Sequence, residues 1–206
     1  MAKNSQLEES IMKAAEELFL QNGFDATSTT DIAKSAGCTQ ALIHYYYRTK
    51  ENLFQQIFTQ KFQLLISHIH EKNNQVNDLE LALRNFVDSY FDTLSKNRQI
   101  PFFLIKELIM NEERRQRMRM RMITDAGSLQ YYTDWDKLIK SEIAKGNIRP
   151  IETMDLTIDV VSLVVFTFIS LPLYSDLFEQ NEEEIRAYLQ RRKEEIITLI
   201  LKGLRK

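Results

Sequence analysis

The sequence predicts an all-α fold, with a small N-terminal three-helix domain followed by a larger helical domain. Three observations support this prediction. Apolar residues recur at three- and four-residue spacings along most of the 206 residues, and no segment shows the sustained alternation typical of strands. Glycine and proline, which break helices, occur only five and three times. With 44% hydrophobic and 27% charged residues, the chain can bury a core and remain in solution.

Composition also indicates the compartment. Cys38 is the single cysteine, so no disulfide can form within the chain, which fits a reducing cytoplasm. The first ten residues contain no apolar signal core, so secretion is not expected. The 16 uncharged residues at 160–175 are fewer than the roughly 20 that a membrane-spanning helix needs. We therefore expect a cytoplasmic protein in which this run forms a core or interface helix.

The first helix is expected over residues 5–21. Its apolar residues follow the i, i+4, i+7, i+8, i+11 spacing of one buried stripe. Gly23 follows the helix end, where glycine readily adopts the left-handed conformation. Phe19 and Phe24 are expected to pack together at this corner. The stripe consists of Leu7, Ile11, Ala14, Ala15 and Leu18.

A second helix is expected to begin at Ser28 or Thr29 and to end at Ala36. Ser28 followed three residues later by Asp31 resembles a capping box, with Asp in place of Glu. Gly37 then provides the turn into the next helix.

A third helix is expected over Gln40–Tyr46, with Thr39 as its N-cap. Seven residues are too few for a stable isolated helix, so it must pack on its neighbours through Ile43 and Tyr47. Two short helices joined by a tight turn, with polar residues outward, are typical of a helix-turn-helix. In that motif one helix crosses the DNA backbone and the next presents its leading residues to base edges in the major groove.

A fourth, longer helix is expected to begin at Lys50 or Glu51. The polar stretch at 71–78 is the best candidate for a joint between two parts of the chain. Pro172 is expected to kink or end one of the later helices early. The further helices are expected over 79–96, 101–123, 128–145, 153–178 and 182–204.

The last two helices favour a subunit interface. Residues 156–171 are apolar nearly all round, which predicts burial on several sides. Residues 182–204 carry one apolar stripe, and Asn181 with Glu184 can cap their start. We favour an interface because a helix-turn-helix gains from two-fold symmetry. The alternative is that both helices close the core of a monomer.

The N-terminal pattern resembles the TetR family of bacterial transcriptional regulators. The matching segments are LFLQNGF at 18–24, TTDIAKSAG at 29–37 and TQALIHYYYRTKENLF at 39–54. The resemblance implies a homodimeric repressor that leaves a palindromic double-stranded DNA operator when it binds a small-molecule effector. It implies a DNA-binding domain at 1–50 and an effector-binding and dimerisation domain at 51–206, with 51–70 as the connecting helix.

Carried over by position, the resemblance assigns three kinds of DNA contact. The assigned residues are Thr29, Thr30 and Lys50 for phosphates; Thr39, Gln40, Ala41 and Leu42 for base edges; and His44 and Tyr45 on the flank toward the backbone. The chain departs from the family pattern at Cys38, where Val is usual, at His44, where Tyr is usual, and at Tyr47, where Phe is usual.

The chemistry of these residues supports part of that assignment. The Gln40 amide matches the N6/N7 edge of adenine, and Lys50 combines a cation with a helix N-terminus, both of which attract phosphate. A solvated surface role is the alternative for each. Residues 1–50 hold five Lys/Arg against six Asp/Glu, which counts against DNA binding by overall charge. The rival hypothesis is therefore a helical small-molecule-binding or adaptor protein that does not bind DNA.

The C-terminal part supplies aromatic residues for an effector pocket, although core packing is the default for each. The mix suggests a mainly apolar effector. No short catalytic, cofactor-binding or metal-binding motif is present, so we expect no enzyme, no cofactor and no metal. The arginines at 114–121 are spread around a helix and suggest a solvated basic segment. The expected ligand-lining residues are Phe103, Met110, Tyr131, Trp135 and Phe166.

Overall fold

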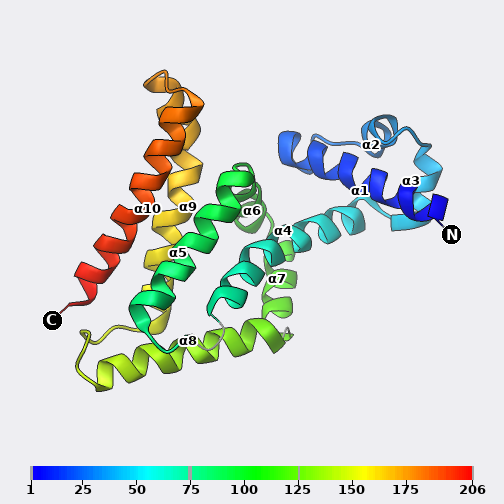
Figure 1. Cartoon of the computed structure of the whole chain (residues 1–206). Coiled ribbons are helices and arrows are strands. Elements are labelled where there is room, and N and C mark those ends of the chain that lie inside the picture. Colours follow the sequence, from blue (N-terminus) through cyan, green and yellow to red (C-terminus); the bar gives the residue numbers. More distant parts are fainter. Residues whose placement is uncertain (1, 74–75, 125, 206) are drawn as a thin grey trace. The chain divides into compact units, whose positions relative to one another are not determined.

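A computed structural model describes the backbone of residues 2–73, 76–124 and 126–205. Side chains are described within these ranges except at 2–5, 65–71, 118, 121–124 and 126–128, so part of the expected connecting helix lies outside them. The described residues form ten helices and no strand, which confirms the all-α prediction (Figure 1). The chain divides into two compact units, Met1–Leu64 and Leu65–Lys206. The division lies within the helix Lys50–Asn73.

The first unit contains three helices and the first part of a fourth. The helices are α1 (Ala2–Asn22), α2 (Thr29–Ser35), α3 (Gln40–Tyr47) and α4 (Lys50–Asn73). α2 packs on both α1 and α3. Fully buried side chains from all four helices form the core, among them Ile11, Phe19, Ile32, Ile43 and Phe54. The two short helices are thus held by burial of their apolar sides, as their length requires.

Aromatic rings close the corner between α1 and α2. Phe19 and Phe24 stack with their ring centroids 6.0 Å apart, as the sequence predicted. Phe54 of α4 meets both rings edge-on, at 5.1 and 5.0 Å. Such edge-to-face pairs add stabilisation beyond the buried area. Gly23 has φ +81°, the left-handed conformation expected after the end of α1.

The second unit contains the end of α4 and six further helices. At its centre, α5 packs against α9 and α10, and α9 packs against α10. The α9 and α10 helices run antiparallel, side by side, in Figure 1. Phe91 and Phe168 meet edge-on in this core, 5.3 Å apart. The six helices are α5 (Leu79–Lys96), α6 (Ile100–Met110), α7 (Glu112–Thr124), α8 (Ala126–Ala144), α9 (Thr153–Leu177) and α10 (Glu182–Leu204).

One expected helix is divided in two. The sequence predicted a single helix over 101–123, but Asn111 has an extended backbone (φ −127°, ψ 102°) between α6 and α7. Its Oδ1 accepts the backbone N–H of Arg114 at 2.9 Å, which caps the start of α7. A buried ion pair between Glu107 and Arg114 then joins the two helices across the break. Because this pair forms only when the chain turns, the helical period of the sequence did not reveal it.

Pro172 does not end α9, which continues to Leu177. The α9 side chains divide sharply by face: Leu156, Val160, Val164 and Phe168 are 0–1% exposed. On the opposite face, apolar side chains are 53–67% exposed in the single chain: Met154, Ile158, Phe166, Leu173 and Leu177. By length and composition α9 resembles a membrane-spanning helix, but in the single chain only one face of it is buried. Burial on several sides, as predicted, requires something to cover the second face.

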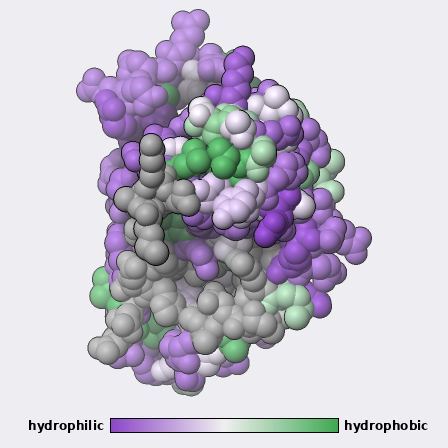
Figure 2. All heavy atoms as spheres, turned by 90° about the vertical axis from the view of Figure 1, so that its right-hand side faces the viewer, coloured by the Kyte–Doolittle hydropathy of each residue, from purple (hydrophilic) through white to green (hydrophobic). Residues whose placement is uncertain are grey.

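The α10 helix matches its prediction closely. Asn181 accepts the backbone N–H groups of Glu183 and Glu184, and the Glu184 carboxylate accepts the Asn181 N–H at 2.8 Å, which completes the capping box. Most of its apolar stripe is buried, but Leu199 is 50% exposed. Most of the residues that Figure 2 colours are hydrophilic, and the hydrophobic ones form small patches.

Candidate nucleic-acid interface

The start of α2 is fixed by the capping box that the sequence predicted. The Ser28 Oγ accepts the backbone N–H of Asp31 at 3.1 Å, and Asp31 Oδ2 accepts the Ser28 N–H at 3.2 Å. The Ser28 hydroxyl also donates to the same carboxylate oxygen at 2.5 Å. These bonds from Ser28 hold the pKa of Asp31 below its usual range. Thr30, two residues into the helix, is exposed.

The turn between α2 and α3 depends on Gly37, whose φ of +65° strains any residue with a side chain. Cys38 follows, and its N–H donates to the Ala33 carbonyl at 2.9 Å. Burial raises the pKa of the Cys38 thiol, which keeps it in the weakly nucleophilic protonated form.

The α3 helix presents its leading residues outward. Ile43 and Tyr47 are 1% and 2% exposed, and the Tyr47 hydroxyl donates to the Glu8 carbonyl at 3.1 Å. This places the opposite side of the helix at the surface: Thr39, Gln40 and Ala41 are exposed, and Leu42 is half-buried. Thr39 has the extended backbone of an N-cap residue, but its side chain makes no capping bond.

Gln40 also links the two short helices. Its Nε2 donates to the Thr29 Oγ1 at 2.5 Å, so the first residues of α2 and α3 are tied together. The bond uses one of the two N–H groups of the amide, and the second N–H and the carbonyl oxygen remain available to a base edge. The sequence suggested a contact with DNA for both residues but gave no sign of a contact between them.

His44 and Tyr45 lie on the exposed side of α3. The His44 Nδ1 is 2.9 Å from the carbonyl oxygen of Arg48, which can only accept, so Nδ1 carries a hydrogen and donates it. Arg48 has φ +67° and ends the helix. The Tyr45 ring is 66% exposed and meets the Tyr46 ring edge-on.

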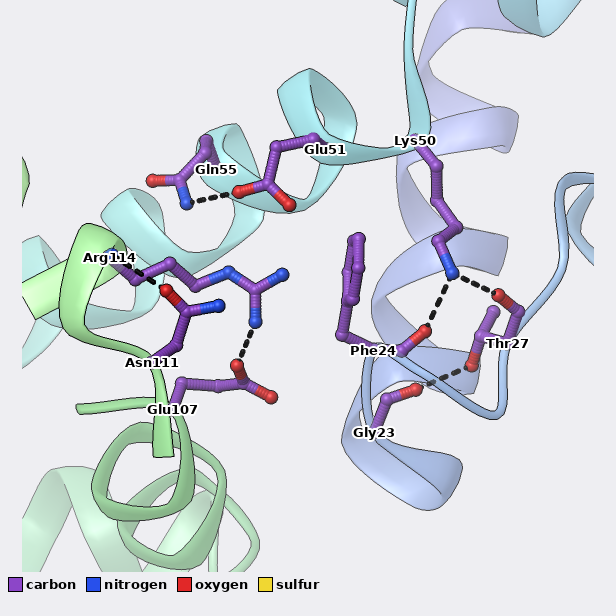
Figure 3. A network of polar contacts seen from close by, with 9 residues as sticks. All are labelled: Gly23, Phe24, Thr27, Lys50, Glu51, Gln55, Glu107, Asn111 and Arg114. Carbon is purple, nitrogen blue, oxygen red and sulfur yellow. Dashed lines mark hydrogen bonds and ion pairs between the residues drawn. The ribbon is translucent and has the colours of Figure 1, made fainter. Parts of the chain in front are cut away.

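Lys50 is half-buried at the start of α4 and is engaged within the protein. Its Nζ donates to the carbonyl oxygens of Phe24 and Thr27, at 2.9 Å each (Figure 3). The same nitrogen lies 4.0 Å from the centroid of the Phe24 ring. The phosphate contact that the family pattern assigns to Lys50 therefore has intramolecular competitors that the sequence did not reveal.

The second unit contains a cavity of about 610 Å³ between the end of α4, α5 and α8. Two of the five expected ligand-lining residues, Tyr131 and Trp135, line it. Of the others, Phe103 is buried in α6, whereas Met110 and Phe166 are 78% and 65% exposed, and none of the three lines this cavity. The full lining is Asn73, Val76, Asn77, Ala82, Gln130, Tyr131, Asp134, Trp135, Lys137, Leu138, Ser141 and Lys145.

One side of this cavity is polar, and its residues are not among those that the sequence predicted as ligand-lining. Gln130, Asp134, Lys137 and Ser141 recur at helical spacing on one side of α8, a signal that was present in the sequence. Trp135 is 5% exposed, and its Nε1 donates to Thr157 at 3.1 Å. Burial raises the pKa of Tyr131 to about 12, so its hydroxyl stays protonated. Within the described part of the chain, no three His, Cys, Asp or Glu side chains gather as metal ligands would.

Comparison with known proteins places the first unit in a recognised class. Residues 11–57 match the family model described as bacterial regulatory proteins, tetR family. The chain is 30% identical to the HTH-type transcriptional regulator QacR of Staphylococcus aureus, in a match covering 46% of the chain and 61% of that protein. It is 30% identical to the HTH-type transcriptional regulator AcrR of Shigella flexneri, over 53% of the chain and 45% of that protein. The matches thus span less than two thirds of these relatives.

Solved structures resemble the fold over nearly its whole length. A bacterial regulatory protein in the tetR family from Rhodococcus RHA1 superposes with a TM-score of 0.71. The match covers 97% of each chain at 19% identity, so it supports the fold alone.

We expect Asp31→Asn to remove a pH-dependent part of the stability. Because the folded-state pKa of Asp31 lies below its unfolded value, the unfolded state binds more protons, and unfolding free energy rises with pH through this range. The stability difference between wild type and variant should be fully present at pH 7, begin to fall at about pH 4, and vanish as the pH drops through the lower folded-state pKa of Asp31. Urea unfolding followed by circular dichroism measures it, with Asp25→Asn as the control. A difference that persists in acid would contradict the assignment.

Proposed function

We propose that the chain is a member of the TetR family of bacterial regulatory proteins, whose family model matches residues 11–57, and that it is a ligand-responsive, DNA-binding transcriptional regulator of the cytoplasm. It acts as a homodimeric repressor that a small-molecule inducer releases from a palindromic operator. The observation that carries this proposal is the outward presentation of Thr39, Gln40 and Ala41 on a helix whose other side is buried.

Selection of bound duplexes from a random-sequence DNA pool by the purified protein tests this function. A regulator enriches a palindrome with half-sites about one helical turn apart, since two recognition helices enter successive major grooves roughly 34–36 Å apart. Its affinity for the selected duplex falls steeply with salt, because phosphate contacts release counterions. The rival, a helical small-molecule-binding or adaptor protein, enriches no sequence.

Gln40 is the residue best placed to read a base. Its side chain is exposed at the first position of α3, and the bond to Thr29 holds the amide in one place. An amide whose remaining N–H and oxygen face the groove matches adenine N7 and N6. In this proposal Thr29 has two roles: it contacts a DNA phosphate, and its hydroxyl holds the Gln40 amide for the base contact.

Replacing Gln40 by alanine should relax base preference at one position of each operator half-site. The loss of a bidentate contact should cost about 1–3 kcal/mol of discrimination at that position and leave the other positions unchanged. Binding measurements on single-base variants of the selected duplex give this value. Gln21→Ala, exposed at the end of α1, is the matched control. A uniform loss at all positions would assign Gln40 to the DNA backbone instead.

The partner that fits the exposed face of α9 is a second copy of the chain. Its five large apolar side chains are more than half exposed in the single chain, and Leu199 of α10 is half exposed. Isologous packing of this face on its twin covers both apolar surfaces at once. Asp155 and Asp159 interrupt the face near its beginning, and Asp176 interrupts it near its end.

Phe166→Glu should therefore convert the dimer into a monomer. A carboxylate placed against its own copy across a two-fold axis adds charge repulsion to lost apolar burial. Sedimentation velocity measures the change. Phe102→Glu is the control, because Phe102 is similarly exposed, at 62%, but lies on α6. A variant that remains dimeric would locate the interface elsewhere.

The cavity beside α8 is the effector site in this proposal. Tyr131 and Trp135 supply aromatic surface, and Asn73, Gln130 and Ser141 supply uncharged polar groups. Charged groups of both signs also line the cavity: Asp134, Lys137 and Lys145. This mixture suits a drug-sized aromatic molecule with several hydrogen-bonding groups, rather than the mainly apolar effector suggested by composition. The effector lowers DNA affinity by its preference for the conformation that binds DNA poorly, typically about 1–3 kcal/mol.

Trp135 is the single tryptophan, so its fluorescence reports on this cavity. In a screen of polyhydroxylated aromatic compounds with palmitate as the apolar comparison, we expect aromatic compounds to change the emission and palmitate to leave it unchanged. Ser141→Phe should abolish the response by filling the cavity, whereas Ser95→Phe, on α5 outside the cavity, should not. A response to palmitate alone would restore the mainly apolar effector.

A further inference from the structure

His44 closes the turn that follows α3. Its backbone carbonyl accepts the N–H of Arg48 at 3.0 Å, and its ring nitrogen Nδ1 donates to the carbonyl oxygen of Arg48 at 2.9 Å. Arg48 ends the helix with φ +67°, a conformation that residues other than glycine rarely adopt. Two hydrogen bonds between the same two residues thus orient the ring, and they commit Nδ1 to the protein.

The His44 ring lies on the same face of α3 as Gln40. The two residues are four positions apart, which makes them neighbours on one face, about 6 Å apart along the helix axis. Both side chains are exposed, whereas Ile43 and Tyr47 are buried on the other side. When Gln40 meets a base edge, a residue one turn later lies beside the wall of the groove, where the phosphates are.

The bond to Arg48 limits what the neutral ring can bind. A neutral imidazole carries one hydrogen, and in His44 that hydrogen is on Nδ1, so Nε2 has only a lone pair. A phosphate oxygen also has only lone pairs, so the two atoms cannot form a hydrogen bond. A second proton turns Nε2 into a charged donor, and each ring nitrogen then has an acceptor. Histidine gains or loses this proton between about pH 5 and pH 8.

The surroundings of α3 leave a charged ring without a competing partner. Asp31 of α2 is bonded to Ser28, and Lys50 of α4 is bonded to two backbone carbonyls. Within the described part of the chain, no ion pair or hydrogen bond joins the His44 ring to a charged side chain. The ring also stands in the last turn of α3, where the helix dipole favours a cation. Charged residues on the elements around α3 include Glu8 of α1, Asp31 and Lys34 of α2, Arg48 in the turn, and Lys50 and Glu51 of α4.

We propose that His44 binds a DNA phosphate through Nε2 and does so only as the doubly protonated imidazolium, so that each α3 takes up a proton when it enters the groove. This inference rests on the proposed function, because it needs an operator. Since the complex holds more protons than the free protein, affinity for DNA rises as the pH falls. The tyrosine that the TetR pattern usually has at this position donates from its hydroxyl without a change of charge. The pH dependence therefore belongs to the histidine of this chain.

His44→Tyr separates this role from a general loss of DNA binding. For the wild type we expect affinity for the selected duplex to fall about tenfold for each protomer between about pH 5.5 and pH 8. The slope of log affinity against log salt should be steeper at the lower pH, by about 0.9 for each phosphate gained. His44→Tyr should bind the duplex with neither change. His70→Gln removes a histidine elsewhere in the chain and should retain both.

Nitrogen NMR of the His44 ring tests the same point in the unmodified protein, and it does not depend on how a variant folds. At about pH 7.5 we expect a hydrogen on Nδ1 alone without DNA and on both nitrogens in the complex. A ring that stays neutral in the complex would overturn the proposal, as would a wild type whose affinity and salt slope do not change with pH. A pH dependence that persists in His44→Tyr would do the same. If no duplex is ever selected, the proposed function itself fails, whereas a selected duplex bound equally well at every pH overturns this inference alone.

Discussion

The two shortest helices, α2 and α3, exist because their apolar sides are buried in a core shared with α1 and the first part of α4. Seven and eight residues do not sustain a helix in water. Burial of Ile32 and Ile43 supplies the stabilisation that helix propensity alone cannot give to such short helices. It also fixes the rotation of each helix about its axis. That rotation places Thr39, Gln40 and Ala41 at the surface. The same packing that allows α3 to form therefore determines which of its side chains can meet DNA.

Several polar side chains in the first unit make hydrogen bonds within the protein even though the family pattern associates them with DNA. Gln40 is bonded to Thr29 and Lys50 to the α1–α2 turn, although all three belong to a pattern associated with DNA contact. Preorganisation of this kind lowers the entropy lost on binding, because the side chains are already restrained. The family pattern names these positions, and the structure adds the contacts that each side chain makes within the protein.

The second unit has two surfaces of different character, the exposed face of α9 and the cavity beside α8. One face of α9 is buried in the core, and the opposite face leaves residues such as Phe166 and Leu173 exposed in the single chain. The cavity beside α8 is instead mixed in character, since it pairs Trp135 and Tyr131 with amide, hydroxyl and charged groups. An apolar face with few polar groups suits a copy of itself, whereas a cavity with convergent polar groups suits a small molecule that must be oriented.

The amino-acid pattern was enough to predict the helical class, most helix bounds, the capping boxes at Ser28 and Asn181, and the burial of Tyr47. These features depend on residues a few positions apart, so the spacing of residue types along the chain is enough to predict them. Tertiary structure alone decided the partners of Lys50, which lie 23 and 26 residues away along the chain, and the grouping of cavity residues from three helices. The division at Asn111 also emerged only in the structure, because a buried pair between Glu107 and Arg114 stabilises a break that the apolar period does not signal. Such contacts join residues that only the folded chain brings together, and no periodicity encodes them.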